Sequence, residues 1–210
     1  MTKANKEFLI SILYSLVLPA ILYFVLKLFQ NNYHIITSPI DNTIPYIPYF
    51  IYIYLFFFPF IIIVLYITFI KDINKYYNGI KTILLELIIT EVIFLIYPTI
   101  IYRPTINSNI DLITKTLLNL TYYFDTPAIN CFPSIHCLLC FQVSYMTILS
   151  KNINPNYKIF ILITSFLIIL STLFIKQHYF YDIIGALIIF IISNIIINKI
   201  STKFVKKVDR

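Results

Sequence analysis

The chain has 210 residues, of which 60% are hydrophobic and 12% are charged, and its formal net charge is +7. A soluble domain carries about twice that charged fraction, so the composition is typical of a membrane protein. The two glycines are too few for a glycine-rich nucleotide-binding loop. The basic residues flank apolar runs and do not alternate with aromatic residues along a stripe, so we expect no nucleic-acid partner.

Six apolar segments reach or approach the length of roughly 20 residues that a helix needs to cross a bilayer core. They are residues 8–29, 46–70, 80–101, 135–150, 157–175 and 181–200. The first segment is too long for a signal peptide and is kept as a helix. None shows the strict alternation of a barrel strand. The sequence therefore predicts an all-α integral membrane bundle of six transmembrane helices, formed as a single domain by residues 1–210.

The basic residues also predict the orientation of the bundle in a cell membrane. If the N-terminus lies inside, twelve lysines and arginines fall on the inner side and four on the outer side. The four on the outer side are Lys27, Arg103, Lys115 and Lys176. Because inner loops are enriched in basic residues, we expect both termini to be cytoplasmic.

Two acidic residues, Glu86 and Glu91, lie within the third predicted span. A carboxyl group inside a membrane is costly, so each is a functional candidate by default. A structural polar contact between helices is the alternative explanation.

The segment between Arg103 and Pro133 is too polar to cross a membrane. Ile110, Ile113 and Leu117 give it a rough helical stripe. We expect a short helix on the outer surface, before the fourth span.

Six polar residues that can do chemistry fall on the predicted outer side: Arg103, Ser134, His136, Lys176, His178 and Asp182. Arginine and lysine neutralise an anion that has several oxygens. Ser134 follows a proline and precedes an apolar run, which is typical of a helix N-cap whose main-chain amides add further donors. The set predicts a phosphate-binding site that needs no metal.

His178 and Asp182 are four residues apart, which places them on one face of a helix. A carboxylate bonded to one imidazole nitrogen fixes the tautomer and makes the other nitrogen a better nucleophile. His136, on a different helix, is then available as an acid. Each residue also has a structural explanation: a histidine bonded between helices, a capping serine, or a lysine reaching the membrane interface.

Zinc binding is the chemical alternative, because Cys131, His136, Cys137 and Cys140 lie close together in the sequence. Cys137 and Cys140 fall inside an apolar helix, where packing as small apolar side chains explains them better. We therefore predict no metal and no cofactor.

Three short motifs resemble the signatures of the type 2 phosphatidic acid phosphatases, which are K-x6-R-P, P-S-G-H and S-R-x5-H-x3-D. The matching residues are Arg103 and Pro104, then Pro133, Ser134 and His136, then Ser171, His178 and Asp182. The resemblance covers about residues 97–186. It implies that His178 is the nucleophile, that Asp182 orients it and that His136 protonates the leaving group. It also implies that Arg103 and Ser134 hold the phosphate.

The chain departs from these signatures at three positions. Ile96 stands in place of the lysine, Ile135 in place of the glycine and Thr172 in place of the second arginine. Lys176 is the candidate that compensates for the missing cations. A variant third motif resembles the branch that includes the inositol-phosphorylceramide synthases.

We therefore expect a lipid phosphatase that acts on a lipid phosphate or an isoprenyl diphosphate at the outer leaflet, with membrane lipids as its surroundings. A lipid phosphotransferase, in which an alcohol replaces water, is one alternative. A non-catalytic membrane protein is another, and a haloperoxidase is a remote one.

Overall fold

The structure is a computed structural model that describes residues 3–106 and 109–208. Over these residues it is helical, and strand-like pairing is limited to isolated bridges. The helices are α1 (Lys3–Ile12), α2 (Leu18–Lys27), α3 (Ile51–Lys71), α4 (Ile73–Ile96), α5 (Leu112–Phe124), α6 (Ile135–Leu149), α7 (Pro155–Phe174) and α8 (Phe180–Val208). A π-helical turn (Leu13–Val17) joins α1 to α2, and short 3-10 turns occur at Pro39–Asn42 and Pro48–Phe50.

Four helical stretches are long and apolar enough to cross a membrane: Asn5–Lys27, Pro48–Lys71, Pro155–Phe174 and Phe180–Ser201. Most of their apolar residues are not covered by the rest of the chain, because only 6% to 39% of each apolar window is buried. A protein dissolved in water rarely exposes so large an apolar surface. These stretches indicate a membrane protein.

The other two predicted spans correspond to α4 and α6. Helix α6 has 15 residues, which at about 1.5 Å per residue is shorter than a bilayer core. Helix α4 has 24 residues, but each window of 18 residues within it contains at least three charged residues. The charged residues of α4 are Lys75, Lys81, Glu86 and Glu91. Four of the six predicted crossings therefore correspond to long apolar helices. The crossings by α4 and α6 stay a prediction.

The bounds of α4 differ from those that the sequence predicted. The helix begins at Ile73 because Asp72 caps it, accepting a hydrogen bond from the main-chain nitrogen of Lys75 at 3.2 Å. It ends at Ile96, shortly before Pro98, which cannot continue a helix. The apolar run therefore continues past the end of α4, and apolar composition alone does not mark where the helix stops.

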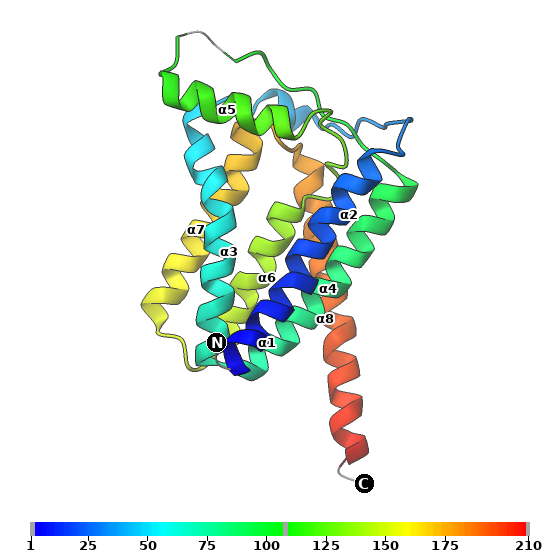
Figure 1. Cartoon of the computed structure of the whole chain (residues 1–210), viewed down its shortest axis with the longest axis vertical. Coiled ribbons are helices and arrows are strands. Elements are labelled where there is room, and N and C mark those ends of the chain that lie inside the picture. Colours follow the sequence, from blue (N-terminus) through cyan, green and yellow to red (C-terminus); the bar gives the residue numbers. More distant parts are fainter. Residues whose placement is uncertain (1–2, 107–108, 209–210) are drawn as a thin grey trace.

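The short helix expected between Arg103 and the fourth span is present as α5. Asp111 caps it, accepting a hydrogen bond from the main-chain nitrogen of Thr114 at 2.9 Å. Tyr122 of α5 donates to the carbonyl oxygen of Ile175 at 2.8 Å, which holds α5 against the end of α7. Figure 1 shows α5 lying across the end of the bundle that is opposite both termini.

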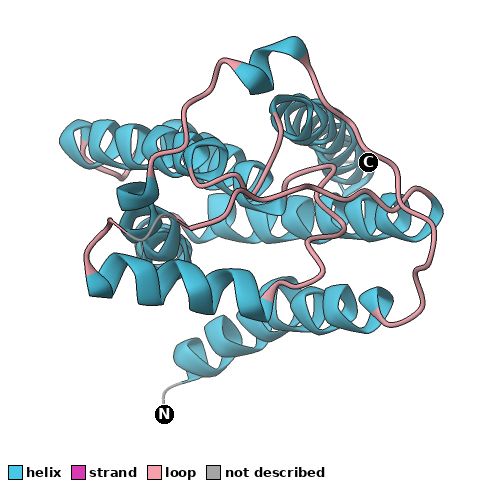
Figure 2. Cartoon of the chain, turned by 90° about the horizontal axis from the view of Figure 1, so that it is seen from above, coloured by secondary structure: helices cyan, strands magenta, loops and turns pink. Residues whose placement is uncertain are grey.

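The core contains two of the cysteines and both acidic residues of α4. Cys137 and Cys140 are fully buried in apolar clusters, which confirms their interpretation as packing residues. Glu86 and Glu91 are 0% and 6% exposed, and among the described residues their carboxyl oxygens have no hydrogen-bond partner. Seen from above in Figure 2, the loops cross over the ends of the helices. The candidate site is formed by the loop segments before Arg103 and before α6, and by the turn between α7 and α8.

Candidate active site

Helix α7 ends in a tight turn that places His178. The main-chain nitrogen of Gln177 donates to the carbonyl oxygen of Thr172 at 2.9 Å, and that of Lys176 donates to the carbonyl oxygen of Leu173 at 3.1 Å. These two bonds define a Schellman motif. Lys176 has the left-handed conformation that this motif requires, with φ of 53°. The next residue after Gln177 is His178, so the turn sets the position of the histidine.

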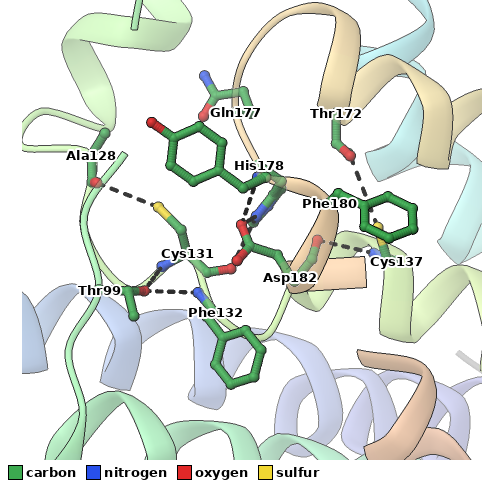
Figure 3. Close-up of polar contacts among 12 residues, drawn as sticks. Thr99, Ala128, Cys131, Phe132, Cys137, Thr172, Gln177, His178, Phe180 and Asp182 are labelled. Carbon is green, nitrogen blue, oxygen red and sulfur yellow. Dashed lines mark hydrogen bonds and ion pairs between the residues drawn. The ribbon is translucent and has the colours of Figure 1, made fainter. Parts of the chain in front are cut away.

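The imidazole of His178 is held by two acceptors, as Figure 3 shows. Its Nδ1 lies 3.1 Å from Oδ2 of Asp182 and 3.0 Å from the carbonyl oxygen of Cys131. Because both partners accept, Nδ1 carries the proton and Nε2 keeps its lone pair. Asp182 is 1% exposed and also accepts from the main-chain nitrogen of Tyr179 at 2.9 Å. The carboxylate therefore caps α8 and orients the histidine at once.

Ser134 begins α6 next to this pair. Its Oγ accepts from the main-chain nitrogen of Cys137 at 3.3 Å, which makes it the N-cap that the sequence predicted. Its own main-chain nitrogen donates to the carbonyl oxygen of Asp182 at 3.1 Å. The start of α6 is thereby fixed against the start of α8.

His136 lies in the first turn of α6, and its ring centre is 5.7 Å from that of His178. On another side it packs against the rings of Tyr54 and Phe57 of α3, at 4.8 and 4.4 Å between ring centres. Among the described residues, its buried Nε2 has no hydrogen-bond partner. His136 of α6 and His178 of the turn between α7 and α8 therefore meet in one site. A carboxylate orients His178, and His136 keeps one ring nitrogen without a protein partner.

The segment before Arg103 pairs with the segment before α6. The main-chain nitrogen of Asn130 donates to the carbonyl oxygen of Thr99 at 2.7 Å. Oγ1 of Thr99 in turn accepts from the main-chain nitrogens of Cys131 and Phe132, at 3.0 and 2.9 Å (Figure 3). This pairing brings the first motif beside the second, although about thirty residues separate them in the chain.

The guanidinium of Arg103 is then oriented by its own contacts. Nη2 donates to Oε1 of Gln177 at 2.6 Å and forms an ion pair with the carboxylate of Asp125. The guanidinium also stacks on the ring of Tyr122, 4.8 Å from its centre. Nε of Arg103 and Nε2 of Gln177 are buried and have no partner among the described residues. Two donors, on Arg103 and on Gln177, the residue that precedes His178, are thus left unsatisfied by the described residues.

Lys176 is engaged elsewhere. Its Nζ donates to the carbonyl oxygens of Ile44 and Asp41, at 2.6 and 3.3 Å. Burial lowers the pKa of Lys176, and the nearby Asp41 opposes that shift. The carboxylate of Asp41 also accepts from the main-chain nitrogen of Phe180 at 2.7 Å, at the start of α8. Lys176 therefore ties the loop at residues 38–44 to the turn before α8, and its binding of phosphate stays a prediction.

Two of the positions that depart from the signatures, Ile96 and Thr172, do not direct a polar side chain into the candidate site. The side chain of Ile96 is 72% exposed at the end of α4, so it faces away from the site. Thr172 is buried, and its hydroxyl donates to the carbonyl oxygen of Ile169 at 2.7 Å. Among the described residues, neither side chain forms a hydrogen bond with His178 or Arg103, and Thr172 contacts His178 through its carbonyl oxygen, which accepts from the main-chain nitrogen of His178 at 3.2 Å.

Sequence reasoning missed four residues of this region. Thr99 organises the two motif segments, Gln177 binds Arg103, and Asp125 and Lys27 form an ion pair beside it. Gln177 could have been found because it directly precedes His178. Lys27 is one of only four basic residues on the predicted outer side, which was a usable signal.

The zinc alternative has no assembled ligand set in the part of the chain that the structure describes: no group of three or more His, Cys, Asp or Glu side chains is close enough to hold a metal. The thiol of Cys131 donates to the carbonyl oxygen of Ala128 at 3.3 Å. Burial raises the pKa of that thiol well above its ordinary value, and the charges of Asp182 and Asp125 raise it further.

The fold and the site together define a helical membrane protein in which an oriented histidine, a second histidine and an arginine meet at one end of the bundle. Comparison with family models matches residues 28–196 to the PAP2 superfamily. The chain therefore belongs to the PAP2 superfamily, and this membership indicates a phosphatase-type membrane enzyme. Searches among curated proteins and among solved structures found no match. The likeness to the branch of inositol-phosphorylceramide synthases stays a prediction.

Proposed function

We propose that the protein is an integral membrane phosphatase that hydrolyses a lipid phosphate or an isoprenyl diphosphate through a phosphohistidine formed on His178. The observation that carries this proposal is the His178–Asp182 pair, with Nδ1 bonded to the carboxylate and a second histidine ring 5.7 Å away. A histidine that only links two helices needs a single hydrogen-bond partner. Here the carboxylate of Asp182 orients His178 as a nucleophile, and His136 lies beside it as the acid.

The substrate phosphate binds beside Arg103, at the start of α6. Arg103 offers its unpartnered Nε, Gln177 offers its unpartnered amide nitrogen, and the first turn of α6 after Ser134 offers main-chain amides. A phosphate has enough oxygens to accept from all of these donors. Binding would satisfy buried polar groups that otherwise lack partners, which favours an anion in this position.

In the first chemical step, Nε2 of His178 attacks phosphorus, and the bond from phosphorus to the lipid oxygen breaks. Protonated His136 gives its proton to that leaving oxygen, so the lipid alcohol or lipid monophosphate departs in its protonated form and His136 is left neutral. Asp182 stabilises the positive charge that develops on the phosphorylated imidazole.

In the second step, water attacks the phosphohistidine. His136 takes a proton from that water, inorganic phosphate leaves, and Nε2 of His178 regains its lone pair. Each step uses only the protein's own residues and water.

The proposed site faces the extracytoplasmic side. The starts of α6 and α8 lie toward the end of the bundle that α5 crosses, opposite both termini (Figure 1). The excess of basic residues near the termini and the inner loops favours a cytoplasmic location for the termini. The apolar outer surfaces of α3, α7 and α8 would lie in the bilayer, so a lipid substrate reaches the site from the outer leaflet.

The test is phosphate release by the purified full-length protein from a panel of lipid phosphates and isoprenyl diphosphates, with EDTA present. We expect release by the wild-type protein and none by His178→Ala. Release that is equal in His178→Ala would contradict the nucleophile assignment. A new lipid product on addition of alcohols, in place of free phosphate, would identify a phosphotransferase instead.

A further inference from the structure

Two buried cations next to the candidate site share one carboxylate. Nζ of Lys27 lies 3.0 Å from Oδ1 of Asp125, while Arg103 contacts Oδ2 of the same carboxylate. The side chains of Lys27 and Arg103 are 8% and 9% exposed, whereas that of Asp125 is 27% exposed. The cations therefore lie deep, and the anion lies at the more open side.

Lys27 is the last residue of α2, far from the family motifs in sequence. One turn earlier, the hydroxyl of Tyr23 contacts Oδ1 of Asp125 at 2.8 Å and the carbonyl oxygen of Ile129 at 3.1 Å. The end of α2 is thereby fixed against the segment that leads into α6. This anchoring keeps the ammonium of Lys27 close to Arg103.

The pair of cations borders the reacting groups. Arg103 reaches Gln177, the neighbour of His178, and the carbonyl oxygen of Cys131 contacts Nδ1 of His178. The charges of both Arg103 and Lys27 oppose the increase in the pKa of the Cys131 thiol, which is consistent with both lying around that residue. Lys27 is thus near the candidate site as well as near Asp125.

Helix α4 supplies no cation at the lysine position of the first signature, because that position is Ile96. Ile96 is 72% exposed, so even a lysine there would begin on the outward side of the helix end. The ammonium of Lys176 is taken by the carbonyl oxygens of Ile44 and Asp41. Among the basic residues near the site, Lys27 is the one that already binds an anion together with Arg103.

We propose that Lys27 and Arg103 form the two-cation clamp for the substrate phosphate, and that the carboxylate of Asp125 occupies the anion position until the phosphate displaces it. A carboxylate presents two oxygens, whereas a phosphate presents more, and Nε of Arg103 and the amide nitrogen of Gln177 are donors that the carboxylate leaves unsatisfied. Asp125 therefore offsets one of the two buried positive charges in the empty enzyme and competes weakly with substrate.

This inference rests on the proposed phosphatase function and makes a different prediction from a purely structural ion pair. If the three charges only hold α2 against the loop, then removing any of them weakens the protein and anion binding in the same direction. If Asp125 competes with phosphate, then removing its charge has the opposite effect from removing the charge of Lys27.

The experiment uses orthovanadate as a phosphate analogue on the full-length protein. Inhibition of phosphate release and the increase in melting temperature with orthovanadate are measured for Lys27→Met, Lys27→Arg and Asp125→Asn. Lys115→Met is the matched control, because it removes one lysine charge on the same predicted side of the membrane.

We expect Lys27→Met to weaken inhibition by orthovanadate about tenfold or more, since a charge-assisted contact is lost, and Lys27→Arg to retain most of it. Asp125→Asn should be inhibited several-fold more tightly and should gain more melting temperature from orthovanadate than the wild type. Lys115→Met should match the wild type.

Wild-type inhibition in Lys27→Met, or weaker inhibition in Asp125→Asn, would overturn the inference while leaving the phosphatase proposal intact. If Lys27→Met does not fold, inhibition of Lys27→Arg and Asp125→Asn by orthovanadate still tests whether Asp125 competes with the phosphate. A wild-type protein that neither releases phosphate nor responds to orthovanadate would overturn the proposed function together with this inference.

Discussion

The substitution Asp182→Asn tests how the nucleophile is oriented. Oδ2 of Asp182 lies 3.1 Å from Nδ1 of His178 and 2.9 Å from the main-chain nitrogen of Tyr179, and the side chain is almost fully buried. Asparagine has nearly the same shape, and its oxygen can still accept these bonds. The change therefore removes mainly the negative charge.

The size of the effect follows from that charge. A hydrogen bond to a charged partner contributes about 1.5–3 kcal/mol, and this stabilisation grows as the imidazole becomes positively charged on phosphorylation. Since about 1.4 kcal/mol is a factor of ten, we expect kcat to fall roughly 10- to 150-fold, with a smaller change in KM.

The assay is initial-rate phosphate release by the purified protein in detergent, with thermal unfolding measured on the same samples. Asp72→Asn is the matched control, because Asp72 caps α4 at the other end of the bundle and asparagine caps equally well. A kcat for Asp182→Asn within threefold of the wild type, in a folded protein, would refute the role of the carboxylate.

Three further predictions concern the surroundings of the nucleophile. His136→Ala should lose activity on a lipid phosphate but keep much more of it on p-nitrophenyl phosphate, whose leaving group needs no acid; equal losses on both would contradict the acid role. Gly185→Ala should lower the free energy of unfolding by about 1–3 kcal/mol, because the new Cβ would lie 2.5 Å from the rigid ring of Phe132. Gly79→Ala, whose Cβ would meet the flexible side chain of Met146, should cost less, and thermal unfolding that reverses this order would refute the packing argument. Metal removal with EDTA should leave the rate of phosphate release unchanged, and a loss that added Zn²⁺ or Mg²⁺ restores would contradict the metal-free mechanism.

Much of the fold could be predicted because apolar runs of membrane length are a strong signal. Helices α3, α7 and α8 begin and end within a few residues of the predicted apolar runs, except where α8 extends past its apolar part. The bounds of α4 were wrong because they depend on the cap at Asp72 and on the stop before Pro98, which hydrophobicity does not report.

The candidate site was predictable where a local motif fixes the geometry. Ser134 is an N-cap, and His178 contacts Asp182 four residues later as predicted. The prediction that both lie on one helix was wrong, because α8 begins at Phe180 and His178 lies in the turn before it. The contacts of Lys27, Asp125 and Gln177 could not be predicted, because they depend on how distant segments pack. Lys176 shows the same limit, since its nearness to His178 in sequence does not determine where its ammonium binds.

Capture of the phosphorylated enzyme tests most directly whether His178 is the nucleophile. Full-length protein is mixed with a lipid phosphate labelled on phosphorus, quenched within a turnover and digested, and the labelled residue is identified by mass spectrometry. We expect an acid-labile, base-stable phosphoryl group on His178 that is absent from His178→Ala. Turnover with the label on another residue, or continued turnover in His178→Ala, would contradict it.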